Sequence, residues 1–379
     1  MKAVISTITK FFNDADILLL ALSVISTVYG IILISSVTRT MEGRFVSVQI
    51  GAAVFGVALF VLFSYLDIDI MADKSRLLFV LSLLFISTLL IWGQGDYVGR
   101  RAWLRFWDIG IQPAEIVKVP FIIVMAKMMV NYKERKTLNS ILSILKLGVV
   151  FAIVFVFVLE VSQDMGTALV YMGIFVVMLF VAGLKLRWFI IAGAAVAAVF
   201  PFLLDNVFAY HQRARILAPF FPDMLTQESL ERYTWQSNLS VTAIASGEFL
   251  GQGLGNGRLT QGDFPAQHTD FIFSAAGEEL GFVGCMLIVI LLVAMIIRCV
   301  YVGAKSNNPL GLLVCTGVAG MLISQTVENI GMALGLMPVI GITLPFFSYG
   351  GSSIVTCFAA MGIVSGIKMR PKPVRFRNL

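Results

Sequence analysis

The residues best placed for chemistry lie at positions 265–282, in the sequence PAQHTDFIFSAAGEELGF. Asp270 stands beside His268 and Thr269 and directly precedes a long apolar run. A carboxylate in this setting is a candidate general base or ligand-binding group. The structural alternative is that Asp270 only caps the N-terminus of the helix that the apolar run forms.

Two further acidic residues, Glu278 and Glu279, follow two helical turns into the same apolar run. Acidic residues inside a membrane span are costly, and they line a cavity or pair with a cation. At about 100° per residue, Glu278 lies roughly 80° from the helix face of Asp270, and Glu279 lies nearly opposite. We therefore expect Asp270 and Glu278 to border one cavity and Glu279 to pair with another helix.

A second polar motif, QPAEIVKVP, occupies positions 112–120. Glu115 and Lys118 are three residues apart, so they face the same side of a helix. They form either an internal ion pair that stabilises the protein, or a site where Lys118 binds an anionic group and Glu115 sets its position. Just upstream, Arg100 and Arg101 add guanidinium groups, which match phosphate oxygens in pairs.

Three other stretches interrupt the apolar sequence. Gln325, Glu328 and Asn329 share one helix face. The sequence GITLPFFSYGGSS at 341–353 would break a lipid-facing helix, so we expect its backbone to be buried in protein or to line a cavity. The glycine run GQGLGNG at 251–257 predicts a mobile or tightly turning loop; it is not a dinucleotide site, because no strand precedes it.

The composition restricts the elements that can position these residues. Of the 379 residues, 58% are hydrophobic and only 13% are charged. A soluble domain carries about 25% charged residues, so these charges are too few to cover a water-soluble surface. Because a membrane span needs about 20 apolar residues, the chain is expected to be an integral membrane protein with about ten spans.

The predicted fold is a single all-α polytopic domain covering residues 1–379, with ten apolar segments of spanning length. They lie at about 17–37, 46–66, 76–93, 113–131, 141–160, 164–184, 187–204, 271–300, 309–331 and 342–367. A long loop at about 205–270 separates the seventh and eighth spans, and a basic tail occupies about 368–379.

The distribution of basic residues predicts the orientation. All lysines outside the predicted spans fall on one side, which the positive-inside rule assigns to the cytoplasm together with both termini. The formal charge of +6 therefore reflects the orientation of the chain in the membrane, and we expect the basic tail to be anchored on membrane lipids. Nucleic acid binding is not indicated, because the sequence has no basic patch with interleaved aromatic residues. The four cysteines lie in apolar runs without metal-site spacing, which argues against a disulfide framework or a zinc site.

These motifs together resemble the SEDS family (shape, elongation, division and sporulation). The resemblance rests on PAQHTDFIFSAAGEELGF, GITLPFFSYGGSS, NIGMALGLMP, SGEFLGQGLGNG and QPAEIVKVP, in this family's order and over the whole chain. Within the family, NIGMALGLMP followed by GITLPF is more similar to the rod-shape (RodA-type) branch than to the division (FtsW-type) branch.

The resemblance implies a peptidoglycan glycosyltransferase that polymerises lipid II into glycan strands at the outer face of the bacterial cytoplasmic membrane. It also implies a class B penicillin-binding protein as partner. The reaction inverts the donor sugar, so a single carboxylate base suffices, and the polyprenyl pyrophosphate leaves without a covalent intermediate. No cofactor is certain, and a divalent cation, Mg²⁺ or Mn²⁺, stays open.

Carried over to this sequence, the family pattern assigns Asp270 as the base. The substrate-binding candidates are the other polar residues of these motifs: Arg101, Glu115, Lys118, His268, Thr269 and Glu278. Arg101 and Lys118 would stabilise the pyrophosphate, and Glu115 would orient Lys118. Ala114 replaces the usual serine, Arg100 and Ala102 flank Arg101 irregularly, and SQDMGT stands where QPDLGT is common. These departures leave the roles of Arg101 and Asp164 less secure than that of Asp270.

Two other functions compete with this one. A lipid II flippase would also use buried charges and broken helices, but a transporter is expected to carry ionisable groups near the membrane midplane and an internal repeat. A scaffold that only recruits the crosslinking partner would leave Lys118, Glu278 and Glu328 in the membrane unexplained. The enzyme is therefore the favoured interpretation.

Overall fold

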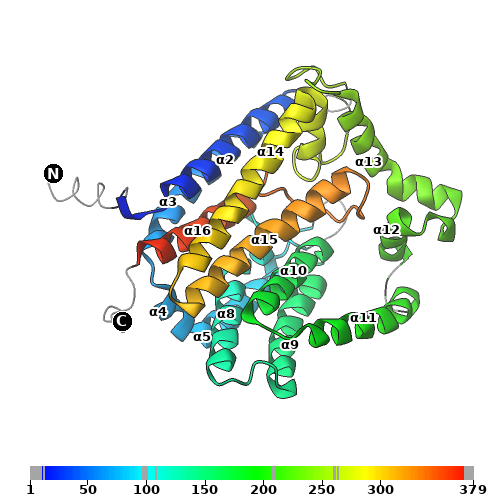
Figure 1. Cartoon of the computed structure of the whole chain (residues 1–379). Helices are drawn as coiled ribbons and strands as arrows, with labels where there is room; N and C mark the ends of the chain where they lie inside the picture. Colours follow the sequence, from blue (N-terminus) through cyan, green and yellow to red (C-terminus); the bar gives the residue numbers. More distant parts are fainter. Residues whose placement is uncertain are drawn as a thin grey trace.

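The computed structural model describes residues 11, 13–95, 101–106, 109–206, 208, 210–258, 262 and 264–370. Arg100 and the basic tail beyond residue 370 lie outside them. The described chain is a bundle of α-helices with one small antiparallel sheet of β1 (Leu104–Phe106) and β2 (Ile109–Ile111) (Figure 1). The predicted all-α membrane architecture is confirmed.

Nine helical segments in the described residues are long and apolar enough to cross a membrane. They are α2 (Ile17–Val37), α3 (Phe45–Tyr65), α5 with α6 (Ser75–Ser87 and Leu89–Trp92), α9 with the π-helical turn η1 (Ile141–Val156 and Phe157–Val161), α10 (Met165–Ala182), α11 (Leu186–Asn206), α14 (Ile272–Lys305), α15 (Pro309–Ala333) and α16 (Gly351–Met369). All nine coincide with predicted spans.

Two predicted spans differ from the structure in an informative way. The span expected at 113–131 consists of a short helix, α7 (Pro113–Ile116), and a longer one, α8 (Lys118–Glu134). The last span was expected to begin at 342, but α16 begins at Gly351, and residues 342–350 are irregular. Pro345 lacks the N–H that a continuous helix needs, and Phe346 has a φ of 68°.

The start of α2 and the end of α16 lie side by side (Figure 1), because the backbone N–H of Asp16 donates to Ser365 Oγ at 3.0 Å. At the opposite end of the bundle, the predicted long loop contains helices of its own. These are α12 (Tyr210–Phe220), the 3₁₀ turn η2 (Pro222–Met224) and α13 (Gln227–Ser246). A short helix, α4 (Ile68–Asp73), connects α3 to α5.

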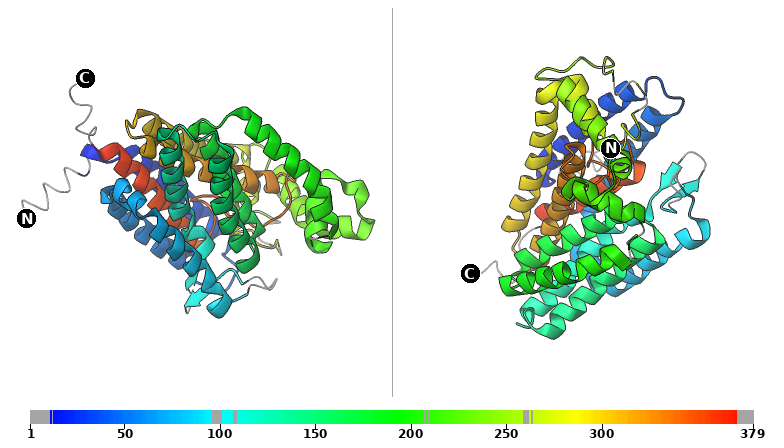
Figure 2. Two further views of the ribbon diagram at one scale, coloured as in Figure 1. Left: turned by 90° about the horizontal axis from the view of Figure 1, so that it is seen from below. Right: turned by 90° about the vertical axis from the view of Figure 1, so that its right-hand side faces the viewer.

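The views in Figure 2 show α11 at the edge of the bundle, and its most apolar stretch has no buried residue. In contrast, α15 and α16 form the centre, where most of their residues are buried. The site residues on α15 and at the start of α16 are therefore shielded from lipid by the surrounding helices.

The contact between α3 and α16 depends on small residues. A Cβ added to Gly362 would lie 2.5 Å from the carbonyl oxygen of Phe60, and one added to Gly366 would lie 2.7 Å from that of Ser64. The Ser64 hydroxyl also donates to the Gly362 carbonyl at 3.2 Å. Close backbone packing of this kind stabilises helix pairs in membranes, where lipid weakens the hydrophobic drive between helices.

Helix α14 is interrupted at Gly281, which has φ 66° and ψ −161°. The carbonyls of Glu278 and Glu279 accept from the N–H groups of Gln252 and Gly253, each at 2.9 Å. Beyond the break, the N–H groups of Phe282 and Val283 donate to the carbonyls of Glu248 and Phe249. The predicted glycine-rich turn therefore satisfies the backbone groups that the break exposes.

We predict that Gly362→Ala lowers the unfolding temperature of the purified chain in detergent. The added methyl group cannot fit against the Phe60 carbonyl, and such overpacking costs about 1–3 kcal/mol. The control is Gly148→Ala on α9, where an added Cβ meets nothing within 4 Å. Equal unfolding temperatures for the two variants would contradict the packing account.

Candidate active site

A tight turn positions the three motif residues at the outer end of α14. The Ala266 carbonyl accepts hydrogen bonds from three successive backbone N–H groups, those of Thr269 (3.2 Å), Asp270 (2.9 Å) and Phe271 (3.2 Å). His268, Thr269 and Asp270 are half-buried. The turn therefore presents adjacent polar side chains just outside the spanning helix.

The structural alternative for Asp270, that it only caps this helix, does not match the helix start. The N-cap of α14 is Phe271, and no side chain makes a capping hydrogen bond there. The Ala266-centred turn carries the chain into the helix at Phe271, one residue after Asp270.

The carbonyl of Asp270 is held by a side chain from another helix. Asn329, fully buried on α15, donates through Nδ2 to the Asp270 carbonyl at 2.7 Å and to the Ile342 carbonyl at 2.6 Å. One amide group thus joins the Asp270 turn to the irregular segment 342–350. The helical spacing predicts Asn329 on a polar face of α15, but it does not predict this contact.

His268 is fixed from the same segment. Its carbonyl accepts from the Tyr349 N–H at 2.8 Å, and its ring packs against Phe45 (5.0 Å between ring centroids) and Tyr349 (5.6 Å). Burial lowers the pKa of His268 below its ordinary value, because the charged imidazolium is poorly solvated there. The ring is therefore neutral at pH 7 and suited to hydrogen bonding.

The Glu115–Lys118 pair forms as the spacing predicts. Lys118 Nζ lies 2.7 Å from Glu115 Oε1, and both side chains are buried at the junction of α7 and α8. Glu115 Oε2 has no hydrogen-bond partner among the described residues. This geometry agrees with the interpretation as an internal ion pair, whereas the anion-binding role of Lys118 stays a prediction.

The segment that carries this pair is anchored at three points. Gln112 makes two of these contacts. Its Nε2 donates to Asp164 Oδ2 at 2.6 Å, and its backbone N–H donates to Ser352 Oγ at 2.9 Å. The Tyr171 hydroxyl donates to the Ala114 carbonyl at 2.8 Å. Asp164 in turn caps α10 by accepting from the Thr167 N–H. The start of α7 is thereby fixed to α10 and α16.

The polar face of α15 points into this region. Lys118 and Asp164 both lie near enough to the half-buried Glu328 to act on it electrostatically. Both polar side-chain atoms of Gln325 are buried without a hydrogen-bond partner among the described residues. Polar groups in this position face the protein interior, as expected of polar residues in a membrane span.

Residues 342–353 connect the two motifs. Through Ile342 and Tyr349 the segment holds the turn at His268 and Asp270, and through Ser352 it holds Gln112. The expectation that this backbone is buried in protein is confirmed: Ile342, Leu344, Phe346, Phe347 and Ser348 are all buried. The two predicted motifs thus belong to one hydrogen-bonded framework.

Two predicted site residues stand outside this framework. Arg101 is exposed in the segment before β1. Glu278 is buried and borders an outer cavity of about 600 Å³, which is also lined by Thr242, Ser246, Gln252, Asn256 and Arg258. Asp270 does not line this cavity, so the structure does not support the expectation of one cavity shared by Asp270 and Glu278.

The described residues contain no group of three or more His, Cys, Asp or Glu side chains that could hold a metal ion. Mg²⁺ is commonly bound by one or two carboxylates together with substrate phosphates, which needs no such group. The divalent cation therefore stays a prediction.

Comparisons with known proteins agree over nearly the whole chain. A family model described as "Cell cycle protein", for FtsW, RodA and SpoVE, matches residues 15–372. The probable peptidoglycan glycosyltransferase FtsW of Geobacter metallireducens is 30% identical over 372 residues, covering 96% of this chain and 97% of that protein. Stage V sporulation protein E of Bacillus subtilis is 29% identical, covering 94% and 97%.

Solved structures are similar over the same length. One, described as "Structural coordination of polymerization and crosslinking by a peptidoglycan synthase complex", has a TM-score of 0.78 at 27% identity, covering 93% of this chain and 97% of that chain. The rod shape determining protein RodA of Thermus thermophilus has a TM-score of 0.66 at 26% identity, covering 93% and 96%. With sequence motifs, fold and family model in agreement, the chain belongs to the FtsW, RodA and SpoVE family of cell cycle proteins, the SEDS family.

Proposed function

We propose that this protein is a peptidoglycan glycosyltransferase that polymerises lipid II at the outer face of the bacterial cytoplasmic membrane. The names of the relatives support the activity. The observation that carries the proposal is the Asn329 contact, in which the Asn329 amide holds the Asp270 carbonyl at 2.7 Å directly before α14. A fixed carboxylate at the outer end of a span is suited to deprotonating a substrate at the membrane surface.

In this mechanism Asp270 accepts the proton of the attacking sugar hydroxyl, and the anomeric carbon inverts as the pyrophosphate leaves. The leaving group gains negative charge and needs cations rather than a proton. Lys118 and Arg101 supply that charge, and Glu115 orients Lys118 through their 2.7 Å contact. His268, neutral at pH 7, and Thr269 hydrogen-bond the substrate beside the base.

The partner and the cellular role belong to the same proposal. A class B penicillin-binding protein would crosslink the strands, and one structural relative is described as a complex for polymerization and crosslinking. The relatives include FtsW proteins, a stage V sporulation protein and a rod shape determining protein, so their names do not distinguish elongation, division and sporulation. We retain the rod-shape branch on its motifs.

Glu278, in its separate cavity, would bind the growing glycan strand.

The first test is Asp270→Asn in the purified chain with lipid II in detergent, with and without a class B partner. Loss of a general base lowers rates by about 10²–10⁴-fold, and we expect polymer formation to fall by that factor. The control is Asp223→Asn, the same change at an exposed position of η2. Parental activity in Asp270→Asn would refute the assignment, and absence of polymer from the parental chain would favour a flippase or scaffold.

Asn329→Asp should reduce the polymerisation rate and the unfolding temperature together. The substitution replaces an amide that serves two carbonyls with a carboxylate that repels them, and each buried unsatisfied group costs about 1–3 kcal/mol. The control is Asn238→Asp, which alters a single contact within α13. If Asn329→Asp polymerised lipid II as fast as the control, the positioning role would be wrong.

A further inference from the structure

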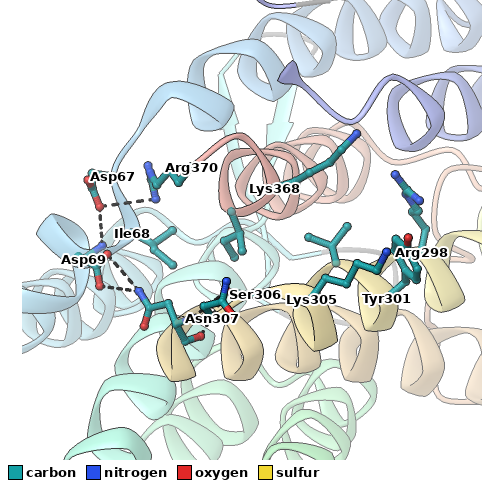
Figure 3. Close-up of a pocket in the computed structure, with 13 residues that line it drawn as sticks. Asp67, Ile68, Asp69, Arg298, Tyr301, Lys305, Ser306, Asn307, Lys368 and Arg370 are labelled. Carbon is teal, nitrogen blue, oxygen red and sulfur yellow. Dashed lines mark hydrogen bonds and ion pairs between the residues drawn. The ribbon is translucent and has the colours of Figure 1, made fainter. Parts of the chain in front are cut away.

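A second polar cavity, drawn in Figure 3, is lined by residues at the end of the bundle where α14 and α16 end. Asp270 lies at the other end of α14. The cavity has a volume of about 860 Å³ and lies between the start of α4, the end of α14 and the end of α16. The lysine distribution assigns this end to the cytoplasm, so the cavity opens toward the inner leaflet. The glycosyltransferase mechanism uses none of its residues.

Four cations and two carboxylates line this cavity. They are Arg298, Lys305, Lys368 and Arg370, with Asp67 and Asp69. Because cations outnumber carboxylates, the lining as a whole favours an anionic ligand.

Only part of this positive charge is neutralised within the protein. Arg298 Nε lies 2.8 Å from the buried carboxylate of Asp16, whereas Lys368 Nζ lies 3.8 Å from the same oxygen, beyond hydrogen-bond distance. Arg370 Nη1 lies 3.5 Å from Asp67 and makes no hydrogen bond among the described residues. Lys368 Nζ also donates to the Ala15 carbonyl at 3.2 Å, and Arg370 Nη2 donates to the Leu66 carbonyl. Because an ammonium carries three N–H donors, Lys368 keeps donors for a ligand, whereas the buried Nη1 of Arg370 contributes charge only.

Lys305 is the least compensated of the four. Its Nζ lies 4.4 Å above the ring of Tyr301, and within the described chain no carboxylate lies within 4.0 Å of it. Asp69, across the cavity, is already bonded to Asn308 at 3.0 Å. The ammonium of Lys305 thus lines the cavity beside the ring and hydroxyl of Tyr301, without a neutralising carboxylate among the described residues.

The surroundings favour a lipid over a free ion. Tyr301 is 45% exposed at the end of a spanning helix, where aromatic side chains mark the headgroup level. On the same helix, Ile297 and Val300 are exposed and lead from the cavity toward the membrane interior. An acyl chain can follow this apolar surface while the headgroup stays at the cations.

We propose that this cavity binds the phosphate headgroup of an anionic phospholipid of the inner leaflet, with Lys305 and Lys368 as its principal contacts. Basic pockets between spanning helices on the cytoplasmic side are suited to such headgroups. The proposal concerns lipid binding alone and does not depend on the glycosyltransferase assignment.

The test is native mass spectrometry of the purified full chain with phosphatidylglycerol or phosphatidylcholine of identical acyl chains. We expect the parental chain to retain phosphatidylglycerol preferentially, and the double variant Lys305→Gln, Lys368→Gln to retain on the order of ten-fold less. The charge-preserving variant Lys305→Arg, Lys368→Arg should retain it as the parent does, which separates loss of charge from misfolding.

The matched control is Lys133→Gln, Lys136→Gln, which removes two exposed lysines from the same side between α8 and α9. Its retention should equal that of the parent. The proposal is overturned if the Lys305 and Lys368 glutamine variant retains phosphatidylglycerol normally, or if the control loses as much. Displacement of the lipid by an equal concentration of inorganic phosphate would assign the cavity to free phosphate instead.

Discussion

The architecture of the candidate site depends on one buried side-chain amide. Inside a membrane protein, irregular backbone must find its hydrogen bonds within the protein, because lipid offers none. The Asp270 turn and the segment 342–350 both leave the helical pattern, and Asn329 donates to a carbonyl of each. The two N–H bonds of one amide therefore join these two carbonyls and fix the base relative to the segment that reaches the Lys118 motif.

The same constraint explains why the remaining irregular segments are held so firmly. The segment 342–350 packs against α2, where a Cβ on Gly30 would lie 2.6 Å from the Phe347 carbonyl. It is also bonded on both sides of its turn by Gln49 of α3, which donates to the Ser348 carbonyl and accepts from the Gly350 N–H. Polar groups anchored in this way need little rearrangement when charge develops in a reaction. The turn at the end of the long outer loop is thus anchored on the interior of the bundle.

Local patterns predicted most of the fold and only part of the site. Apolar length located the spans, and the spacing of Glu115 and Lys118 predicted their contact, because both depend on neighbours in the sequence. The predicted start of α16 at 342 was wrong, because Pro345 and the positive φ of Phe346 keep this segment out of the helix. The N-cap of α14 falls at Phe271 and not at Asp270. The link from Asn329 to Asp270 joins residues 59 positions apart, and no local periodicity signals it.

The central claim is that Asn329 acts on the reaction through Asp270, and a double-mutant cycle tests it most directly. Polymerisation rates of lipid II would be measured for the parental chain, Asp270→Asn, Asn329→Asp and the double variant. Residues that act as one unit give non-additive effects. The account predicts that Asn329→Asp costs no further rate once Asp270 is Asn. If instead the two losses multiply in full, Asn329 acts independently of the base and the account is contradicted.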